Sequence, residues 1–564
     1  MENKEYMLID GNPVEINGEK NLLEVIRKAG IELPTFCYHS ELSVYGACRM
    51  CMVENSHGGM EAACSTVPKA GMEIYTNTER LHKHRKMILE LLLANHCRDC
   101  TTCQKNGKCR LQELASLFGL ESIRFKNLKP EPELDTSSLS IIRDAHKCIL
   151  CGDCVRMCNE IQNVGAIDFV NRGSKMVIGP AFNEPIANSP CVGCGQCAAV
   201  CPTGAIVIRK DTGRVWPELN DKNTKVVAQV APAVRVAMAK EFGLPENENS
   251  MGRITAALRR LGFDEVYDTA TGADLTVLEE SNEFLQRIEA GENLPLITSC
   301  CPAWIQYCEK NHPELMKNIS TCKSPMQMFS SVIKAEYANS SRRVVCVAVM
   351  PCTAKKFECA REEFMHDGVP ETDYVITTQE LIQMIHKAGI VFDELEPEAV
   401  DSVFSTCTGA GVIFGVTGGV TEAVLRRLST DKSKKALLSI AFNDVRGMKG
   451  VKETTIPYGD KELRIAIVSG LKNAESVIQA LKNGEHFDFI EVMACPGGCV
   501  AGGGQPFGTN ATKEVRGKAL YSADKMLSIK RSEENPLMLS LYDGVLKGRV
   551  HELLHVHYNH KEEE

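Results

Sequence analysis

The segment CILCGDCVRMC (148–158) spaces its cysteines as C-x2-C-x2-C-x3-C, and CVGCGQCAAVC (191–201) repeats that spacing. Two such runs bind a pair of 4Fe–4S clusters, and the fourth cysteine of each run ligates the other cluster. We therefore expect one cluster on Cys148, Cys151, Cys154 and Cys201, and its partner on Cys191, Cys194, Cys197 and Cys158.

Two further cysteine groups precede this pair. Cys37, Cys48, Cys51 and Cys64 lie in a segment that opens with a strand-turn-strand pattern, YMLIDGNPVEI, and a helical pattern, NLLEVIRKAG. Four thiolates on a small β-rich domain favour a 2Fe–2S cluster, and zinc is the alternative. His96, Cys100, Cys103 and Cys109 follow the pattern H-x3-C-x2-C-x5-C, whose spacing fits zinc or a 4Fe–4S cluster.

Composition limits the class of protein. A chain of 564 residues exceeds one core, so three or four domains are expected. The net charge of −9 gives no support for nucleic-acid binding, and RLHKHRK (80–86) is predicted to be a solvated helix face. No secretory signal and no apolar run of membrane-spanning length is visible, so we expect a cytoplasmic protein without membrane contact. In that reducing compartment, 26 cysteines indicate metal ligands, catalytic thiols and buried apolar thiols, not disulfides.

The pattern changes near residue 224, where strands begin to alternate with helices, as in α/β layers. Three apolar runs end at cysteines: LPLIT before Cys300 and Cys301, VVCVAVMP before Cys352, and FDFIEVMA before Cys495 and Cys499. Such runs indicate buried parallel strands, whose carboxyl ends form sites in α/β sheets. Glycines at 497, 498 and 502–504 would let the backbone approach a bulky group. The upstream clusters indicate an electron wire, and these thiols its terminus.

Three motifs carry a family resemblance. TSCCPAW (298–304), MPCTAKKFE (350–358) and EVMACPGGCVAGGGQP (491–506) resemble the signature motifs of the FeFe (iron-only) hydrogenases. The tail GRVHELLHVHY (548–558) also fits the carboxyl end of that family. The resemblance covers nearly the whole chain, and the upstream groups match the long, monomeric clostridial type with four accessory clusters.

The resemblance implies an H-cluster, a 4Fe–4S cube joined by one thiolate to a two-iron unit with carbon monoxide, cyanide and a dithiolate bridge. Matched by motif, the cube ligands are Cys301, Cys352, Cys495 and Cys499, with Cys499 as the bridge. Lys355 would hydrogen-bond a cyanide, because a buried ammonium needs an anionic partner. Met350, Met493, Pro232 and Pro325 would line the pocket. The resemblance also favours a cluster over zinc at the His96 group.

Two positions differ from the family pattern or vary within it. Met326 stands where the family often has glutamine, which changes the polar contacts expected near the two-iron unit. Pro496 occupies a position where the family varies between proline and histidine. Neither removes a ligand. Outside the ligand groups, we expect Cys97, Cys308, Cys322, Cys346, Cys359 and Cys407 to serve packing, which leaves Cys300.

The segment LEESNEFLQR (278–287) has helical spacing, with Glu280, Glu283 and Arg287 on one face. An amphipathic helix with a salt bridge is the simpler interpretation. The resemblance favours a proton path, Arg287–Glu283–Ser320–Glu280–Cys300, running inward from the surface. The adjacent cysteines would then differ in role: Cys301 holds the cluster, while Cys300 passes protons.

The predicted fold class is multidomain α+β and α/β, with ferredoxin-like iron–sulfur domains followed by a large α/β catalytic domain. The expected domains are a β-grasp 2Fe–2S domain (1–80), a His/Cys3 4Fe–4S domain (81–125), a bacterial ferredoxin-like domain with two 4Fe–4S clusters (138–210) and an H-cluster domain (220–564). The cofactors would be one 2Fe–2S cluster, three accessory 4Fe–4S clusters and the H-cluster.

The resemblance implies a ferredoxin hydrogenase that converts protons and electrons reversibly to H2. Its partners would be ferredoxin or flavodoxin, and maturation proteins that supply the two-iron unit. One alternative is the catalytic subunit of a bifurcating complex that also uses NADH; GAGVIFG (409–415) lacks the dinucleotide-binding spacing, so the NADH subunit would be separate. A non-catalytic sensor, an iron–sulfur assembly relative and an electron conduit like that of complex I are further alternatives, which the terminal motifs disfavour.

Overall fold

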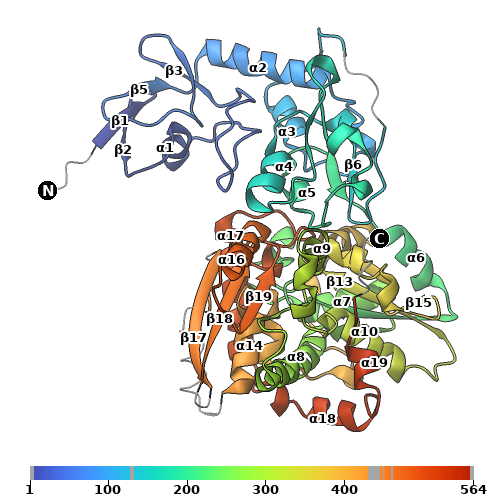
Figure 1. Cartoon of the computed structure of the whole chain (residues 1–564). Helices are drawn as coiled ribbons and strands as arrows, with labels where there is room; N and C mark the ends of the chain where they lie inside the picture. The colour runs from blue at the N-terminus through green and yellow to red at the C-terminus, as the bar shows by residue number, and fades with distance from the viewer. Residues whose placement is uncertain (1–4, 128–132, 430–444, 449, 459–460, 559–564) are drawn as a thin grey trace. The chain divides into compact units, whose positions relative to one another are not determined.

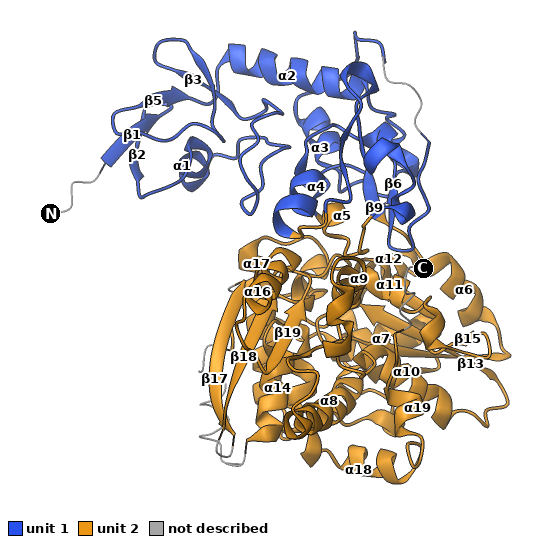
Figure 2. Ribbon diagram, in the orientation of Figure 1, with its two compact units in different colours: residues 1–161, 165–189, 200–207 blue, residues 162–164, 190–199, 208–564 orange. Residues whose placement is uncertain are grey.

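The structure is a computed structural model that describes residues 5–127, 133–429, 445–448, 450–458 and 461–558 (Figure 1). They fall into two compact units, coloured in Figure 2. The first unit contains residues 1–161, 165–189 and 200–207, and the second contains 162–164, 190–199 and 208–564. Within the predicted 138–210 domain, residues 190–199 therefore group with the predicted H-cluster domain. The four domain boundaries stay a prediction.

The first unit begins with a small sheet. Strands β1 (Glu5–Ile9) and β2 (Asn12–Ile16) form the predicted hairpin, and α1 (Leu22–Lys28) follows. Strand β5 (Glu73–Tyr75) pairs parallel to β1, and β3 (Met52–Asn55) and β4 (Met60–Ala62) complete the order β2-β1-β5-β3-β4. Leu22, Val25 and Ile26 bury one face of α1 against this sheet, as its apolar spacing requires.

Helix α2 (Glu79–Ala94) contains the basic stretch RLHKHRK. The prediction that this stretch is a solvated face is wrong for Arg85, which is 4% exposed. Its guanidinium donates to the carbonyl oxygens of Met50, Met52 and Thr76 at 2.8–3.3 Å. Arg85 therefore fixes α2 to the loop that carries Cys48 and Cys51, because buried carbonyls need donors.

The second unit contains two four-stranded sheets. The first has the order β11 (Glu265–Asp268), β10 (Thr224–Val230), β13 (Arg343–Met350) and β16 (Tyr374–Thr377), with all pairs parallel. The second has the order β12 (Leu296–Ile297), β19 (Phe489–Met493), β18 (Lys461–Ser469) and β17 (Val451–Tyr458), of which only β17 is antiparallel to its neighbour. The α/β pattern predicted from residue 224 onward is confirmed.

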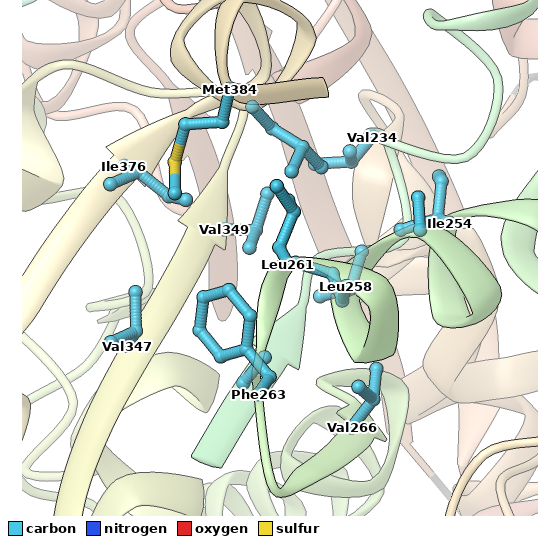
Figure 3. Packing of buried hydrophobic residues seen from close by; sticks show 14 of the residues in the cluster. Val234, Ile254, Leu258, Leu261, Phe263, Val266, Val347, Val349, Ile376 and Met384 are labelled. Atoms are coloured by element: carbon cyan, nitrogen blue, oxygen red, sulfur yellow. The ribbon is translucent and has the colours of Figure 1, made fainter. Parts of the chain in front are cut away.

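Helices α7 (Met251–Leu261) and α12 (Thr378–Lys387) pack in the core of the first sheet. In Figure 3, Ile254, Leu258 and Leu261 of α7 gather with Val347 and Val349 of β13. Strand β13 carries buried apolar side chains on both of its faces, which is why VVCVAVM is one uninterrupted apolar run.

Helix α8 (Ala270–Ala290) contacts both sheets. Its Leu275 shares an apolar cluster with Val227 of β10. Its Phe284 packs edge-on against Phe489 of β19, with the two ring centroids 5.2 Å apart. Helix α8 therefore packs against one sheet through Leu275 and against the other through Phe284. Of the helices in the described ranges, none is long and apolar enough to span a membrane.

Candidate functional site

A cavity of about 90 Å³ lies in the second unit, where the predicted strands end. Strand β12 ends just before Cys300, β13 ends just before Cys352, and β19 ends just before Cys495. All three are parallel strands, as predicted, but β13 belongs to one sheet and β12 and β19 to the other. The thiols meet because the carboxyl ends of two sheets converge, and not because one sheet carries all three.

Every residue predicted for this pocket lines the cavity. These are Cys300, Cys301, Cys352, Cys495, Cys499, Lys355, Met350, Met493, Pro232 and Pro325. Met326 lines it as well, so the position that departs from the family pattern faces the same space. Motifs more than 190 residues apart are thus brought to one place, with Cys301 and Cys499 as the outermost ligand positions.

The donor set fits an iron–sulfur cofactor. Among the described residues, no three His, Cys, Asp or Glu side chains converge as a single metal ion requires; the four predicted cube ligands surround a cavity instead. Burial raises the pKa of Cys352 to about 11 and that of Cys499 to about 12. Four thiolates in such a space need bound positive metal, which deprotonates a coordinating thiol.

Lys355 is the only charged residue among the described residues that line the cavity. Burial alone would lower the pKa of its ammonium, but the charge of Glu358, whose Oε2 lies 2.7 Å from Nζ, raises it overall. Lys355 Nζ also donates to the Cys300 carbonyl oxygen at 3.3 Å. Glu358 was missed in the sequence, although its i+3 position after Lys355 in MPCTAKKFE was the available signal.

Close backbone packing explains the glycine triplet. A Cβ on Gly502 would lie 2.2 Å from the Pro351 carbonyl oxygen, and one on Gly503 would lie 2.4 Å from that of Cys194. The glycines therefore admit neighbouring backbone, in addition to lining the cavity at Gly498 and Gly502.

The second cysteine run adjoins the cavity within the second unit. The Gln196 amide nitrogen donates to Cys495 Sγ at 3.1 Å and to the Ala501 carbonyl oxygen at 2.9 Å. Thr353 Oγ1, next to Cys352, donates to the Gly193 carbonyl oxygen at 2.7 Å. A cluster on Cys191, Cys194 and Cys197 would therefore be the nearest neighbour of the cavity cofactor, and Gln196 was not predicted to join them.

Within the first unit, Cys148, Cys151, Cys154 and Cys201 line one smaller cavity. This is the set expected when the fourth ligand comes from the other run. Of the partner set, Cys158 lies in the first unit and the other three cysteines lie in the second, so that set stays a prediction.

The two upstream groups share an apolar cluster with the first run. Cys37, Cys48, Cys109 and Cys151 all belong to it, together with Phe36, Met50 and Leu111. Cys51 and Cys64 belong to the core of the five-stranded sheet of the first unit. Arg156 links the groups further, since its guanidinium donates to the Cys37 carbonyl oxygen at 2.8 Å. Three of the predicted cluster sites are therefore neighbours, which an electron wire requires.

The His96 group also packs against the ferredoxin-like region. The Arg98 backbone N–H donates to His96 Nδ1 at 3.1 Å, so a ligand bond would use Nε2. Cys100 and Cys103 bracket a 3-10 turn, and Cys109 precedes α3 (Arg110–Leu117). A Cβ on Gly204 would lie 2.6 Å from Cys103 Sγ, so glycine there permits close approach of the Cys201 loop.

The outer half of the predicted proton path forms a continuous set of contacts. Arg287 donates to Glu283 Oε1 at 2.5 Å, and Ser320 Oγ donates to Glu283 Oε2 at 2.7 Å. The Thr321 backbone N–H donates to both carboxylate oxygens of Glu283 at 3.1 Å. Helix α8 supplies Glu283 and Arg287 one turn apart, as the sequence predicted.

The inner half consists of Glu280 and Cys300. Both oxygens of Glu280 are fully buried, and Ser320 and the Ser299 backbone lie beside its carboxyl group. Burial, with Glu283 and Glu491 nearby, raises the pKa of Glu280 to about 8. Burial and the neighbouring Glu280 also raise the pKa of Cys300 well above its usual value. Both groups therefore hold a proton at neutral pH, and Cys300 carries its proton at the cavity wall.

Of the cysteines predicted to serve packing, Cys322 also contacts the predicted proton path. Cys308 and Cys346 are buried in apolar clusters, as predicted. Cys322 is equally buried, but its Sγ lies 3.9 Å from Glu283 Oε2 and its N–H donates to Ser320 Oγ at 3.2 Å. Cys322 thus touches two members of the predicted path, a contact that its position two residues after Ser320 did not reveal.

The fold and site define an iron–sulfur oxidoreductase, and five family matches agree. Residues 224–503 match the C-terminal domain of the large subunit of iron-only hydrogenases, and 510–561 match the iron hydrogenase small subunit. Upstream, residues 6–79 match a 2Fe–2S cluster-binding domain, 85–124 the iron–sulfur region of NADH-ubiquinone oxidoreductase G, and 147–209 a 4Fe–4S dicluster domain.

Similar proteins identify the family. The chain is 41% identical over 98% of both chains to the NADP-reducing hydrogenase subunit HndD of Solidesulfovibrio fructosivorans. It is 35% identical to iron hydrogenase 1 of Clostridium pasteurianum, covering 98% of this chain and 99% of that one. A solved structure of the FeFe-hydrogenase HydA1 from Chlamydomonas reinhardtii matches with a TM-score of 0.54 and 37% identity, over 62% of this chain and 98% of that one. The chain belongs to the FeFe-hydrogenase family.

The predicted family and fold class are thereby confirmed: ferredoxin-like iron–sulfur domains accompany an FeFe-hydrogenase catalytic domain. The chain is a hydrogenase-family oxidoreductase whose domains bind 2Fe–2S and 4Fe–4S clusters and an H-cluster.

Proposed function

We propose that the protein interconverts two protons, two electrons and H2 at an H-cluster in the cavity of the second unit. The observation that carries this proposal is that Cys301, Cys352, Cys495 and Cys499 line one apolar cavity together with Lys355. These four cysteines would hold the cube, and Cys499 would bridge to the two-iron unit. When bound, the two-iron unit supplies the iron at which electrons and protons combine.

The chain's own side chains would shape that site in two ways. The Lys355 ammonium, oriented by Glu358, would donate to an anionic cyanide, as a buried cation favours a nearby anion. Met350, Met493, Pro232 and Pro325 would exclude water from the cavity, which strengthens electrostatic interactions inside it.

Protons would reach Cys300 from Glu283 through Ser320 and Glu280. The contacts of Glu283 with Ser320 support the outer step, and the raised pKa of Glu280 supports the inner one, because a carboxyl that stays protonated near neutral pH can donate. The Cys300 thiol would deliver the proton at the cavity wall.

Electrons would pass through one 2Fe–2S cluster on the Cys37 group and three accessory 4Fe–4S clusters. The apolar cluster shared by three groups supports the upstream part of this route, and Gln196 supports its last step, since it joins the second run to Cys495. The His96 group would hold a 4Fe–4S cluster. The cysteine content favours a reducing compartment, the cytoplasm.

Two electron partners are in competition. Ferredoxin or flavodoxin is the donor that we propose for a chain acting as a monomer. The similarity to a subunit named as NADP-reducing favours the second candidate, a catalytic subunit within an NAD(P)-linked or bifurcating assembly. In both cases, maturation proteins would supply the two-iron unit.

One set of measurements tests the function and separates the partners. Matured protein should show infrared bands of bound carbon monoxide and cyanide and should evolve H2 with reduced methyl viologen. Protein without such bands and without turnover would contradict the function. Gel filtration of native protein then separates the candidates: a monomer active with ferredoxin supports the first, and a larger assembly that needs NADH or NADPH supports the second.

A further inference from the structure

The carboxyl-terminal tail lies directly beside the outer end of the proton path. The Val556 backbone N–H donates to the Thr321 carbonyl oxygen at 2.7 Å, and the Lys323 N–H donates to the Leu554 carbonyl oxygen at 2.9 Å. These bonds form a short antiparallel bridge between Cys322 and His555. The tail motif HELLHVHY therefore places an imidazole next to the loop that contacts Glu283.

His555 uses both ring nitrogens in contacts with this region. Its Nδ1 lies 2.9 Å from Thr321 Oγ1, and its Nε2 lies 3.2 Å from Glu279 Oε2. An ionised carboxylate only accepts, so in the neutral ring Nε2 carries the proton and Nδ1 accepts from the Thr321 hydroxyl. Protonation at Nδ1 would reverse that second bond and make the imidazole the donor to Thr321.

His555 is connected to the surface by a second histidine. The His551 side chain, one turn earlier on α19 (Val550–Leu554), is exposed, and its ring centroid lies 4.6 Å from that of His555. The His555 side chain itself is only 8% exposed. The exposed His551 ring therefore packs against the His555 ring, and His555 contacts Thr321. The Thr321 backbone N–H in turn donates to Glu283.

Arg287 cannot load the path, although it occupies the outer end. A guanidinium does not release its proton at ordinary pH. Its N–H groups are also committed to Glu283 and to the carbonyl oxygens of Asn293, Asn318 and Ile319. Arg287 can orient Glu283, but a group that titrates near neutral pH is needed to take protons from solvent, and imidazole is that group.

We infer that the His551–His555 pair is the proton entrance of the path, with His555 supplying each proton to Glu283, whose carboxylate the neighbouring Thr321 backbone N–H holds. In this step, a proton from solvent converts the His555 imidazole to imidazolium, the imidazolium releases a proton through a bridging water molecule to the Glu283 carboxylate, and the imidazole returns to its neutral form. Two such transfers and the two electrons from the clusters complete one H2. The inference rests on the proposed function and adds its point of proton entry.

Glu279 is the carboxylate that lies against the His555 ring. Burial tends to raise the pKa of Glu279, but hydrogen bonds from His555 and Tyr542 and the positive charge of Arg427 lower it overall, so Glu279 stays ionised beside the ring. The other titratable neighbours are Cys322, across the bridge, and His551. Glu279 of α8 therefore contacts both the His555 imidazole and Tyr542 of α18 (Pro536–Asp543).

The test compares His555→Gln and His555→Asn with wild type in matured protein. Both amides can keep a hydrogen bond, to Glu279 or Thr321 respectively, but neither can titrate. We expect both variants to keep the carbonyl and cyanide bands, while methyl-viologen-driven H2 evolution falls about tenfold or more, because general acid–base groups contribute 10²–10⁴-fold. The solvent isotope effect should rise, and added imidazole buffer should restore part of the rate.

His557→Gln is the matched control, since His557 lies in the same tail and is exposed. It should leave rate, pH profile and isotope effect unchanged. Wild-type rates in both His555 variants, or a loss that imidazole does not restore, would overturn the entrance. An inactive wild type with intact bands would instead contradict the proposed function, so the two failures are distinguishable.

Discussion

The two units build their sulfur sites in different ways. In the first, Cys148, Cys151 and Cys154 stand within one short loop-helix segment, and only Cys201 comes from elsewhere. In the second, the four cavity cysteines follow three strands in two sheets. A local site depends on spacing, whereas the cavity depends on the whole α/β core. Loss of a ligand in the first unit should therefore lower the rate of electron supply in part, whereas loss of a ligand in the second unit should abolish H2 turnover.

The largest effect is expected for Cys301→Ala. This change removes a cube ligand, so the variant should lose the carbonyl and cyanide bands and all H2 turnover. Cys308→Ala is the control, because Cys308 is buried in an apolar cluster near the same strand and should keep both. Infrared spectra of the two variants, matured side by side, decide the matter; bands retained in Cys301→Ala would contradict its role.

Next comes Cys300→Ala, which leaves all four cube ligands in place. The bands should persist while turnover falls at least about 100-fold, the usual contribution of a proton-transfer group. Cys300→Asp should retain measurable activity, because a carboxyl also carries a proton. If Cys300→Ala evolves H2 near the wild-type rate, the assignment of Cys300 as a proton relay is wrong. If Cys300→Ala loses the bands, Cys300 and not Cys301 is the cube ligand.

Glu280→Gln should slow turnover by a similar or smaller factor and also change the pH dependence of stability. The pKa of Glu280 is raised from its usual 4.5 to about 8 by burial and by nearby Glu283 and Glu491. The neutral carboxyl is therefore favoured in the fold, and stability should be lost as pH rises from 4.5 to about 8. Thermal unfolding of Glu280→Gln should show less of this loss, and identical slopes would contradict the shift.

A ligand change in the first unit should have a smaller and donor-dependent effect. Cys154→Ser disturbs the cluster predicted in the smaller cavity. Ferredoxin-driven turnover should fall, while methyl-viologen-driven turnover should stay near wild type, because a small donor reaches the catalytic unit directly. Equal losses with both donors would show that the cluster supports the catalytic unit itself and not electron supply alone.

The smallest effect is expected at the His96 group. Iron and zinc analysis of anaerobically purified protein should find no stoichiometric zinc, and His96→Ala should lower the iron content without removing the infrared bands. One zinc per chain that disappears in His96→Ala would show that the group is a zinc site.

Spacing and apolar runs were enough to predict much of this molecule. The hairpin after Tyr6, the strand before Cys352 and the one-face alignment of Glu283 and Arg287 follow from local periodicity, which the sequence displays directly. Contacts between distant segments could not be predicted the same way. Gln196 beside Cys495, Cys322 beside Glu283 and His555 beside Thr321 depend on how the sheets and the tail meet.

The close packing at Gly503 limits how the chain can be shortened. A fragment beginning near residue 220 would separate Gly503 from the Cys194 carbonyl oxygen that it packs against, and would remove the Gln196 donor to Cys495. It would also leave Thr353 without its acceptor at Gly193. A catalytic fragment that starts near residue 220 should therefore be less stable at the cavity than one that starts before residue 190 or carries residues 190–199 as a grafted segment.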